Sequence, residues 1–181
     1  MRDLKNKHSV FDEEDANKMY ILSVIVENKP GVLFRITNLF RSRNFNIESI
    51  TVGITEKPDL SRMTITTVSD VKTLEQLVKQ LQKLIDVIQI NVLNKENAVY
   101  RELALIKMSA KDPTTRIEIA NFASIYRGNI MDISNETITV EIIGTPDKID
   151  AFKNLVSGYG IIQVARTGVS ALPRGTVDDD L

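Results

Sequence analysis

The chain has 181 residues, 43% of them hydrophobic, which is enough apolar material for one domain or for two small ones. Its 23 Lys and Arg residues almost balance 24 Asp and Glu residues, so no basic surface for nucleic acid is expected. The absence of cysteine excludes disulfides and thiolate nucleophiles, and a single histidine leaves few ways to build a metal site. No window holds the roughly 18 apolar residues that a membrane span needs.

The two ends of the chain are polar. Residues 1–18 carry the acidic run Asp12-Glu13-Glu14-Asp15 and are expected to form an extension before the first domain, with His8 as a solvated side chain. Residues 173–181 carry three consecutive aspartates before the final Leu181 and are expected to form a mobile tail. These segments add no catalytic or metal-binding residue.

A first domain is predicted over residues 19–94. Met19–Glu27 is a β-branched run typical of a buried strand, and the apolar positions from Val32 to Phe40 recur at helical spacing, with the helix ending near Asn44. Alternating residues around 50–55 and a strand over 60–69 follow. Asp70 is placed to cap a second amphipathic helix, before a last strand over 87–93. The predicted order is βαββαβ.

A second domain is predicted over residues 98–172, after the hydrophilic run 94–97. Residues 100–108 alternate as a strand, and Asp112-Pro113 supplies a helix cap followed by proline at the first helical position. Strands over 129–133 and 137–143, a helix that starts at Thr145-Pro146 and a strand over 160–165 complete the same order.

The predicted fold class is therefore α+β, with two consecutive ferredoxin-like βαββαβ domains. Each should form a four-stranded antiparallel sheet with both helices on one face. The other face is expected to stay uncovered, so apolar residues there or on an edge strand favour self-association or docking.

The segment Glu27–Leu33 is the best candidate for a binding site, because it leads from a strand into the start of a helix. The first backbone N–H groups of a helix lack intrahelical partners and favour a carboxylate. Gly31 permits close approach of the backbone, and the Asn28 amide offers both a donor and an acceptor, as an amino acid requires. The alternative is purely structural: Asn28 caps the helix, Pro30 stiffens the turn and Gly31 turns the chain.

Several separate stretches of the chain match one known family together: Tyr20–Asn28 with Gly31-Val32-Leu33, Phe45–Val52, Leu60–Ile65, Leu74–Val87, Tyr100–Leu103 and Val164–Gly168. These stretches resemble the ACT-domain regulatory small subunits of acetolactate (acetohydroxyacid) synthase. The resemblance makes the first predicted domain an ACT domain. One departure is Asn44, where members of the family often have glycine, but asparagine tolerates the left-handed conformation of such a turn.

The resemblance implies a regulatory subunit without catalytic residues, cofactor or metal. In this family two ACT domains pair side by side and hold a branched-chain amino acid, usually valine, between two chains. It implies that Asn28 and Gly31 contact the effector's polar atoms, with backbone from Val32 and Leu33. Asn46 would add a polar contact and Ile47 an apolar wall.

The same resemblance implies the wider assembly. The partner is a cytoplasmic catalytic subunit that uses thiamine diphosphate, Mg and FAD, activated by this chain and inhibited through it by valine. An ACT sensor of a different enzyme remains the alternative. An independent enzyme is disfavoured by the lack of an activated nucleophile, and an RNA-binding module by the lack of aromatic residues on the strand over 60–69.

Overall fold

The structure, a computed structural model, describes residues 18–94 and 96–175, which form two compact units. Of these residues, 18–94, 96–99 and 171–175 belong to the first unit, and Tyr100–Ser170 form the second. The predicted second domain, 98–172, is therefore two residues too long at each end, because residues 98–99 and 171–172 group with the first unit. His8, most of the predicted extension and the end of the predicted tail lie outside the described residues.

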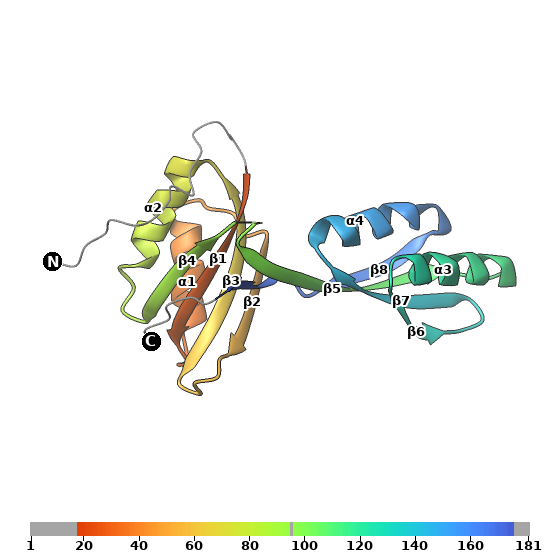
Figure 1. Cartoon of the computed structure of the whole chain (residues 1–181), viewed down its shortest axis with the longest axis horizontal. Helices are drawn as coiled ribbons and strands as arrows, with labels where there is room; N and C mark the ends of the chain where they lie inside the picture. Colours follow the sequence, from red (N-terminus) through yellow and green to blue (C-terminus); the bar gives the residue numbers. More distant parts are fainter. Residues whose placement is uncertain (1–17, 95, 176–181) are drawn as a thin grey trace. The chain divides into compact units, whose positions relative to one another are not determined.

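The first unit has the predicted βαββαβ order (Figure 1). Its elements are β1 (Lys18–Glu27), α1 (Val32–Ser42), β2 (Ser49–Ile54), β3 (Leu60–Ser69), α2 (Val71–Leu81) and β4 (Val87–Leu93). The sheet order is β2-β3-β1-β4, and every neighbouring pair is antiparallel. The two central strands come from positions far apart in sequence, and β2 and β4 form the edges.

The core of the first unit lies between the sheet and its two helices. Alternate residues of β1 face the helices, where they meet apolar side chains one helical turn apart on α1 and α2. The buried helical residues are Val32, Ile36, Phe40, Leu74, Leu77 and Leu81. Burial of this stripe fixes α1 on the sheet, and with it the loop that precedes α1.

The opposite face of this sheet is not uncovered, and the expectation of an open face is wrong for the first unit. Ile21, Ser23 and Ile25 alternate with the core residues of β1, yet each is at most 2% exposed. Part of the reason is the long side chain of Arg62, which reaches over the strand, with Nη1 donating to Ser23 Oγ at 2.7 Å.

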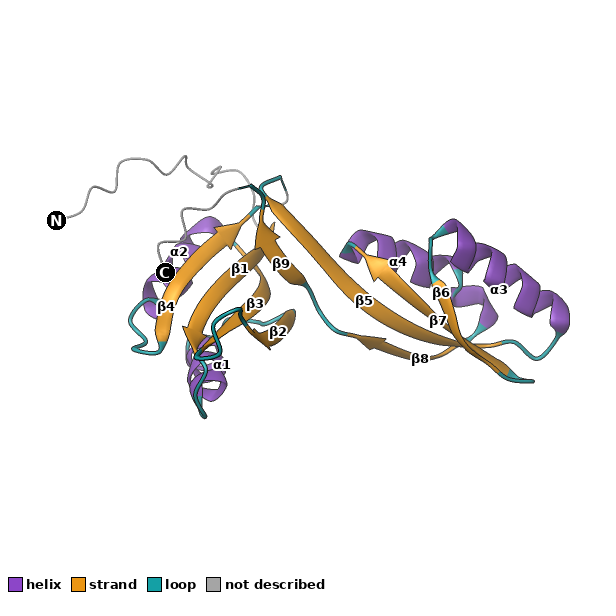
Figure 2. Cartoon of the chain, turned by 60° about the horizontal axis from the view of Figure 1, so that its bottom comes forward, coloured by secondary structure: helices purple, strands orange, loops and turns teal. Residues whose placement is uncertain are grey.

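The second unit repeats the order of elements (Figure 2). Its elements are β5 (Ala98–Ser109), α3 (Pro113–Ile125), β6 (Asn129–Ile133), β7 (Thr137–Gly144), α4 (Pro146–Leu155), the short 3-10 helix η1 (Ser157–Tyr159) and β8 (Ile161–Arg166). The sheet order is β6-β7-β5-β8, and β9 (Ser170–Pro173) also pairs with β5. Both helices cover one face of this sheet.

The other face of the second sheet is open, as expected. Leu105 and Ile143 point away from the helices and are 38% and 48% exposed, whereas Ile106 and Ile142 beside them are fully buried. The α+β class and the repeated βαββαβ plan predicted from the sequence are thus confirmed. The two units differ in that the outer face of the sheet is buried in the first and exposed in the second.

Two predicted helix caps are present with closely matching geometry. The Asp70 carboxylate accepts hydrogen bonds from Thr73 N at 2.9 Å and Thr73 Oγ1 at 2.7 Å. The Asp112 carboxylate accepts from Thr115 N at 2.8 Å and Thr115 Oγ1 at 2.7 Å. These hydrogen bonds, chiefly those from the threonine hydroxyls, lower the pKa of both aspartates. They satisfy backbone donors at the starts of α2 and α3.

Candidate functional site

The loop between β1 and α1, residues 28–31, ends where α1 begins, and no side chain caps that helix start. Gly31 is the residue at the N-cap position and has φ 85° and ψ −9°, a left-handed conformation that glycine adopts at little cost. The first helical bond runs from Arg35 N to Gly31 O at 3.0 Å. The amides of Leu33 and Phe34 precede this bond, so the helix itself supplies no acceptor for them.

Asn28 does not cap the helix, so the structural alternative for this residue is wrong. Its Nδ2 donates instead to Pro58 O at 3.0 Å, and its backbone N donates to Asp59 O at 2.7 Å. Both acceptors belong to the turn between β2 and β3. The loop is therefore held to a neighbouring turn. This contact uses the Nδ2 donor of Asn28, and Oδ1 is the acceptor atom of the same side chain.

Two ion pairs flank the loop. Arg35 forms a bidentate pair with Asp86, with Nε 2.6 Å from Oδ2 and Nη2 2.8 Å from Oδ1. The Arg35 hydrogen bond lowers the pKa of the Asp86 carboxyl group. Lys29 Nζ lies 2.9 Å from Glu27 Oε2, and this hydrogen bond raises the pKa of the Lys29 ammonium group. Two cations and two carboxylates thus balance around the loop.

The predicted loop residues divide into buried and accessible ones. The Val32 side chain is part of the core, and its backbone N already donates to Lys29 O at 3.4 Å. Leu33 is 45% exposed and Phe34 is 71% exposed. Asn28 and Gly31 are also exposed. The helix start can accordingly be reached from solvent through its backbone groups, as an amino-acid site requires.

Asn46 and Ile47 lie beyond the C-terminal end of α1. Asn44 has φ 58°, and Phe45 N donates to Phe40 O at 2.9 Å, so asparagine does adopt the left-handed turn expected of it. Asn46 is exposed, with Nδ2 donating to Glu48 Oε1 at 2.6 Å, while Ile47 is half-buried against the core. Thr67 Oγ1 donates to Asn46 O at 2.7 Å and holds this segment on β3.

The structure does not bring these two groups of residues together within one chain. α1 separates them, and its 11 residues span about 16 Å at the usual rise of an α-helix. The loop 28–31 follows the end of β1, whereas Asn46 is tied to Thr67, which pairs with Tyr20 near the start of β1. A site that uses both groups would need a second copy of the chain.

Sequence reasoning missed Arg35 and Asp86. Arg35 follows Gly31 by four residues, and that spacing could have placed it near the loop. Asp86 is 51 residues further on, and no local pattern predicts the pairing. In the described part of the chain, no three His, Asp or Glu side chains gather as metal ligands, and no helix is long and apolar enough to cross a membrane.

Comparison with known proteins agrees with this architecture. A family model described as the AHAS small subunit-like ACT domain matches residues 22–89, and another described as the small subunit of acetolactate synthase matches residues 101–175. The chain is 48% identical over 157 residues to a probable acetolactate synthase small subunit of Methanothermobacter thermautotrophicus, covering 87% of this chain and 94% of that protein. The chain belongs to the family of acetolactate synthase small subunits.

Other members of the small-subunit family match over the same length. The acetolactate synthase small subunit of Mycolicibacterium smegmatis is 47% identical over 156 residues, covering 86% of this chain and 91% of that protein. The crystal structure of the small subunit from Thermotoga maritima has a TM-score of 0.80 at 42% identity and covers 88% of this chain and 99% of that chain. The resemblance noted in the sequence, including the ACT domain, is thereby confirmed.

Proposed function

We propose that this chain is the regulatory subunit that binds the catalytic subunit of acetolactate synthase, raises its activity and makes it sensitive to valine. The observation that carries the proposal is the uncapped, accessible start of α1 in a member of the small-subunit family. Free amides at a helix start favour a carboxylate. The acceptor Oδ1 of Asn28 suits an ammonium group.

A homodimer completes the proposed site. β2 is an edge strand, and its Val52 and Ile54 are 48% and 68% exposed. Two β2 strands that pair antiparallel around a two-fold axis would put the start of one beside the end of the other. Such pairing would bring Asn46 and Ile47 of one chain toward the loop 28–31 of its partner.

Regulation then follows from differential binding. Valine at the dimer interface stabilises an arrangement in which the catalytic subunit is less active, whereas docking of the effector-free chain favours the active arrangement. A coupling free energy of about 1–3 kcal/mol gives a change of roughly 5- to 150-fold. Thiamine diphosphate, Mg and FAD belong, in this proposal, to the cytoplasmic catalytic subunit.

Reconstitution tests the proposal. The purified chain is added in increasing ratio to its catalytic subunit, and acetolactate formation from pyruvate is measured with and without valine. The expected result is activation that saturates with the chain and is reversed by valine. If activity does not change at any ratio, the chain is not the regulator of this enzyme.

A further inference from the structure

Arg35 has hydrogen-bonding capacity beyond its pair with Asp86. A guanidinium group carries five N–H donors in a fixed plane, and the pair with Asp86 uses one from Nε and one from Nη2. The Asp86 side chain is 8% exposed, whereas the Arg35 side chain is 45% exposed. Arg35 is thus anchored on its buried edge and accessible on its other edge.

The accessible edge lies beside the loop 28–31. A Cβ atom built on Gly31 would lie 3.4 Å from Nη1 of Arg35. Nη1 is therefore next to the residue where α1 begins, and it adds side-chain donors to the backbone amides at this helix start. Planar guanidinium donors match the two oxygens of a carboxylate.

Asp86 accepts hydrogen bonds from residues on both sides of the loop 28–31. Its carboxylate holds Arg35 after the loop, and its backbone O accepts a hydrogen bond from Glu27 N at 2.9 Å before the loop. One residue just before β4 therefore holds the two ends of the segment from 27 to 35. The fork of Arg35 is held in one orientation before any ligand binds, which lowers the cost of binding.

We infer that Arg35 supplies the side-chain contact to the carboxylate of the amino-acid effector, and that Asp86 is the residue that positions Arg35. The inference rests on the proposed function and adds two residues to its site. It also assigns the hydrogen bonds of recognition. The effector's carboxylate accepts from Arg35 and the amides of α1, and its ammonium donates to Asn28 Oδ1.

The test compares valine with valinamide, which keeps the ammonium and side chain but lacks the carboxylate. Both are titrated calorimetrically into the full-length chain and into Arg35→Gln. Loss of a charge-assisted hydrogen bond should weaken valine binding by about 10- to 150-fold. Valinamide binding should change little, so the preference for valine over valinamide should collapse.

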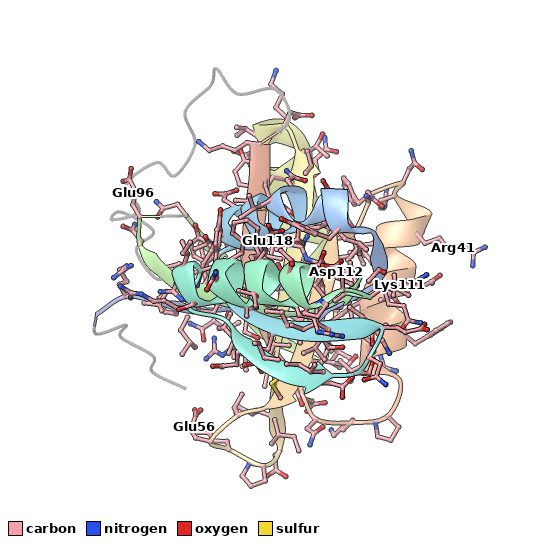
Figure 3. The ribbon with its side chains drawn as sticks, turned by 90° about the vertical axis from the view of Figure 1, so that its right-hand side faces the viewer. Arg41, Glu56, Glu96, Lys111, Asp112 and Glu118 are labelled. Atoms are coloured by element: carbon pink, nitrogen blue, oxygen red, sulfur yellow. The ribbon has the colours of Figure 1, made fainter. Side chains whose placement is uncertain are left out.

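Arg41→Gln is the matched control. Arg41 is exposed in the last turn of the same helix and points away from it (Figure 3), so its removal should leave both affinities unchanged. Arg35→Lys keeps the charge but loses the planar fork and should recover only part of the valine affinity. Asp86→Asn should weaken valine binding in the same selective way as Arg35→Gln.

The outcomes separate the inference from the proposal beneath it. If Arg35→Gln leaves valine affinity unchanged, or lowers valine and valinamide affinity in the same proportion, Arg35 has at most a structural role and the inference fails. If the unmodified chain binds neither valine, leucine nor isoleucine, the proposed function itself fails. Circular dichroism of each variant verifies that the fold is retained.

Discussion

The first helices of the two units occupy the same place in the same topology but begin differently. α3 begins at Asp112, whose carboxylate accepts hydrogen bonds from Thr115 N and Oγ1. α1 begins at the left-handed Gly31, and no side chain caps it. The start of α3 is thus occupied by the protein's own carboxylate, whereas no side chain accepts from Leu33 N and Phe34 N at the start of α1, which suit a carboxylate from outside.

The second helices are also provided with acidic groups. α2 has the Asp70 cap, and α4 has Pro146 and Asp147 in its first turn. Among the four α-helices in the described residues, α1 alone has neither a capping side chain nor an acidic residue in its first turn. Under the proposed function, one helix start of a repeated fold is reserved for a ligand because one capping side chain is left out.

The largest expected effect comes from giving α1 the acid that α3 has. Gly31→Asp places a carboxylate beside Nη1 of Arg35 and the free amides, where it competes with the effector's carboxylate and repels it. Like charges in contact cost several kcal/mol, so valine affinity should fall more than about 100-fold. Calorimetric titration and the reconstituted enzyme both report this change, and activation without valine should be retained.

Gly158→Asp is the control for that substitution, because an added Cβ at Gly158 meets no atom within 4 Å. It introduces the same side chain into the second unit and should leave valine binding intact. Unaltered valine affinity in Gly31→Asp would remove the start of α1 from consideration as the site.

The converse change removes a cap from the second unit. Asp112→Ala should lower the free energy of unfolding by about 1 kcal/mol, because backbone donors at the start of α3 lose their acceptor. Asp70→Ala should cost a similar amount in the first unit, and neither should alter valine affinity. Urea denaturation followed by circular dichroism measures the stability. New valine binding in Asp112→Ala would show that capping alone distinguishes α3 from α1.

A smaller effect is expected at the repeated Asn-Ile pairs, Asn46-Ile47 and Asn129-Ile130. Asn46 Nδ2 donates to Glu48 Oε1, two positions along the chain, and Asn129 Nδ2 donates to Glu141 Oε1 on the neighbouring strand β7, so each amide makes one hydrogen bond to a glutamate. Asn46→Ala should weaken valine binding roughly threefold to tenfold, because that factor corresponds to the usual net free energy of one hydrogen bond. Asn129→Ala should leave it unchanged. Equal effects of the two variants on valine affinity would contradict the proposed role of Asn46.

The smallest effect concerns the cap of α3 under acid. The folded-state pKa of Asp112 is lowered by hydrogen bonds from Thr115, so its carboxylate stabilises the fold above the unfolded-state pKa of about 4. That contribution is lost as the pH falls through the lower, folded-state pKa. Asp112→Asn caps comparably without titrating, so the stability difference between the two proteins should change only below about pH 4. Urea denaturation at several pH values measures it.

The fold was predictable because its signals are local. The helical stripe of Val32, Ile36 and Phe40, the strand patterns and the caps Asp70 and Asp112 each depend on residues a few positions apart. The left-handed turn at Asn44 is of the same kind, since it follows from the end of one helix. Such features need no knowledge of distant contacts.

The arrangement of the site was only partly predictable, because its contacts join distant segments. The role of Asn28 depends on Pro58, 30 residues away, and that of Arg35 on Asp86, 51 residues away. Whether Asn28 could cap α1 also depended on the conformation of Gly31. The outer face of the first sheet also has a contact between distant segments, since Arg62 Nη1 donates to Ser23 Oγ across 39 positions.

Proton–nitrogen correlation NMR during a valine titration tests most directly whether the uncapped start of α1 holds the effector. The amides of Gly31, Val32, Leu33 and Phe34 should shift as valine binds, together with those of Asn46 and Ile47. The amides at the start of α3, where Asp112 already supplies the carboxylate, should stay in place. Valine binding that leaves the α1 amides unmoved, or that moves those of α3 instead, would contradict the account.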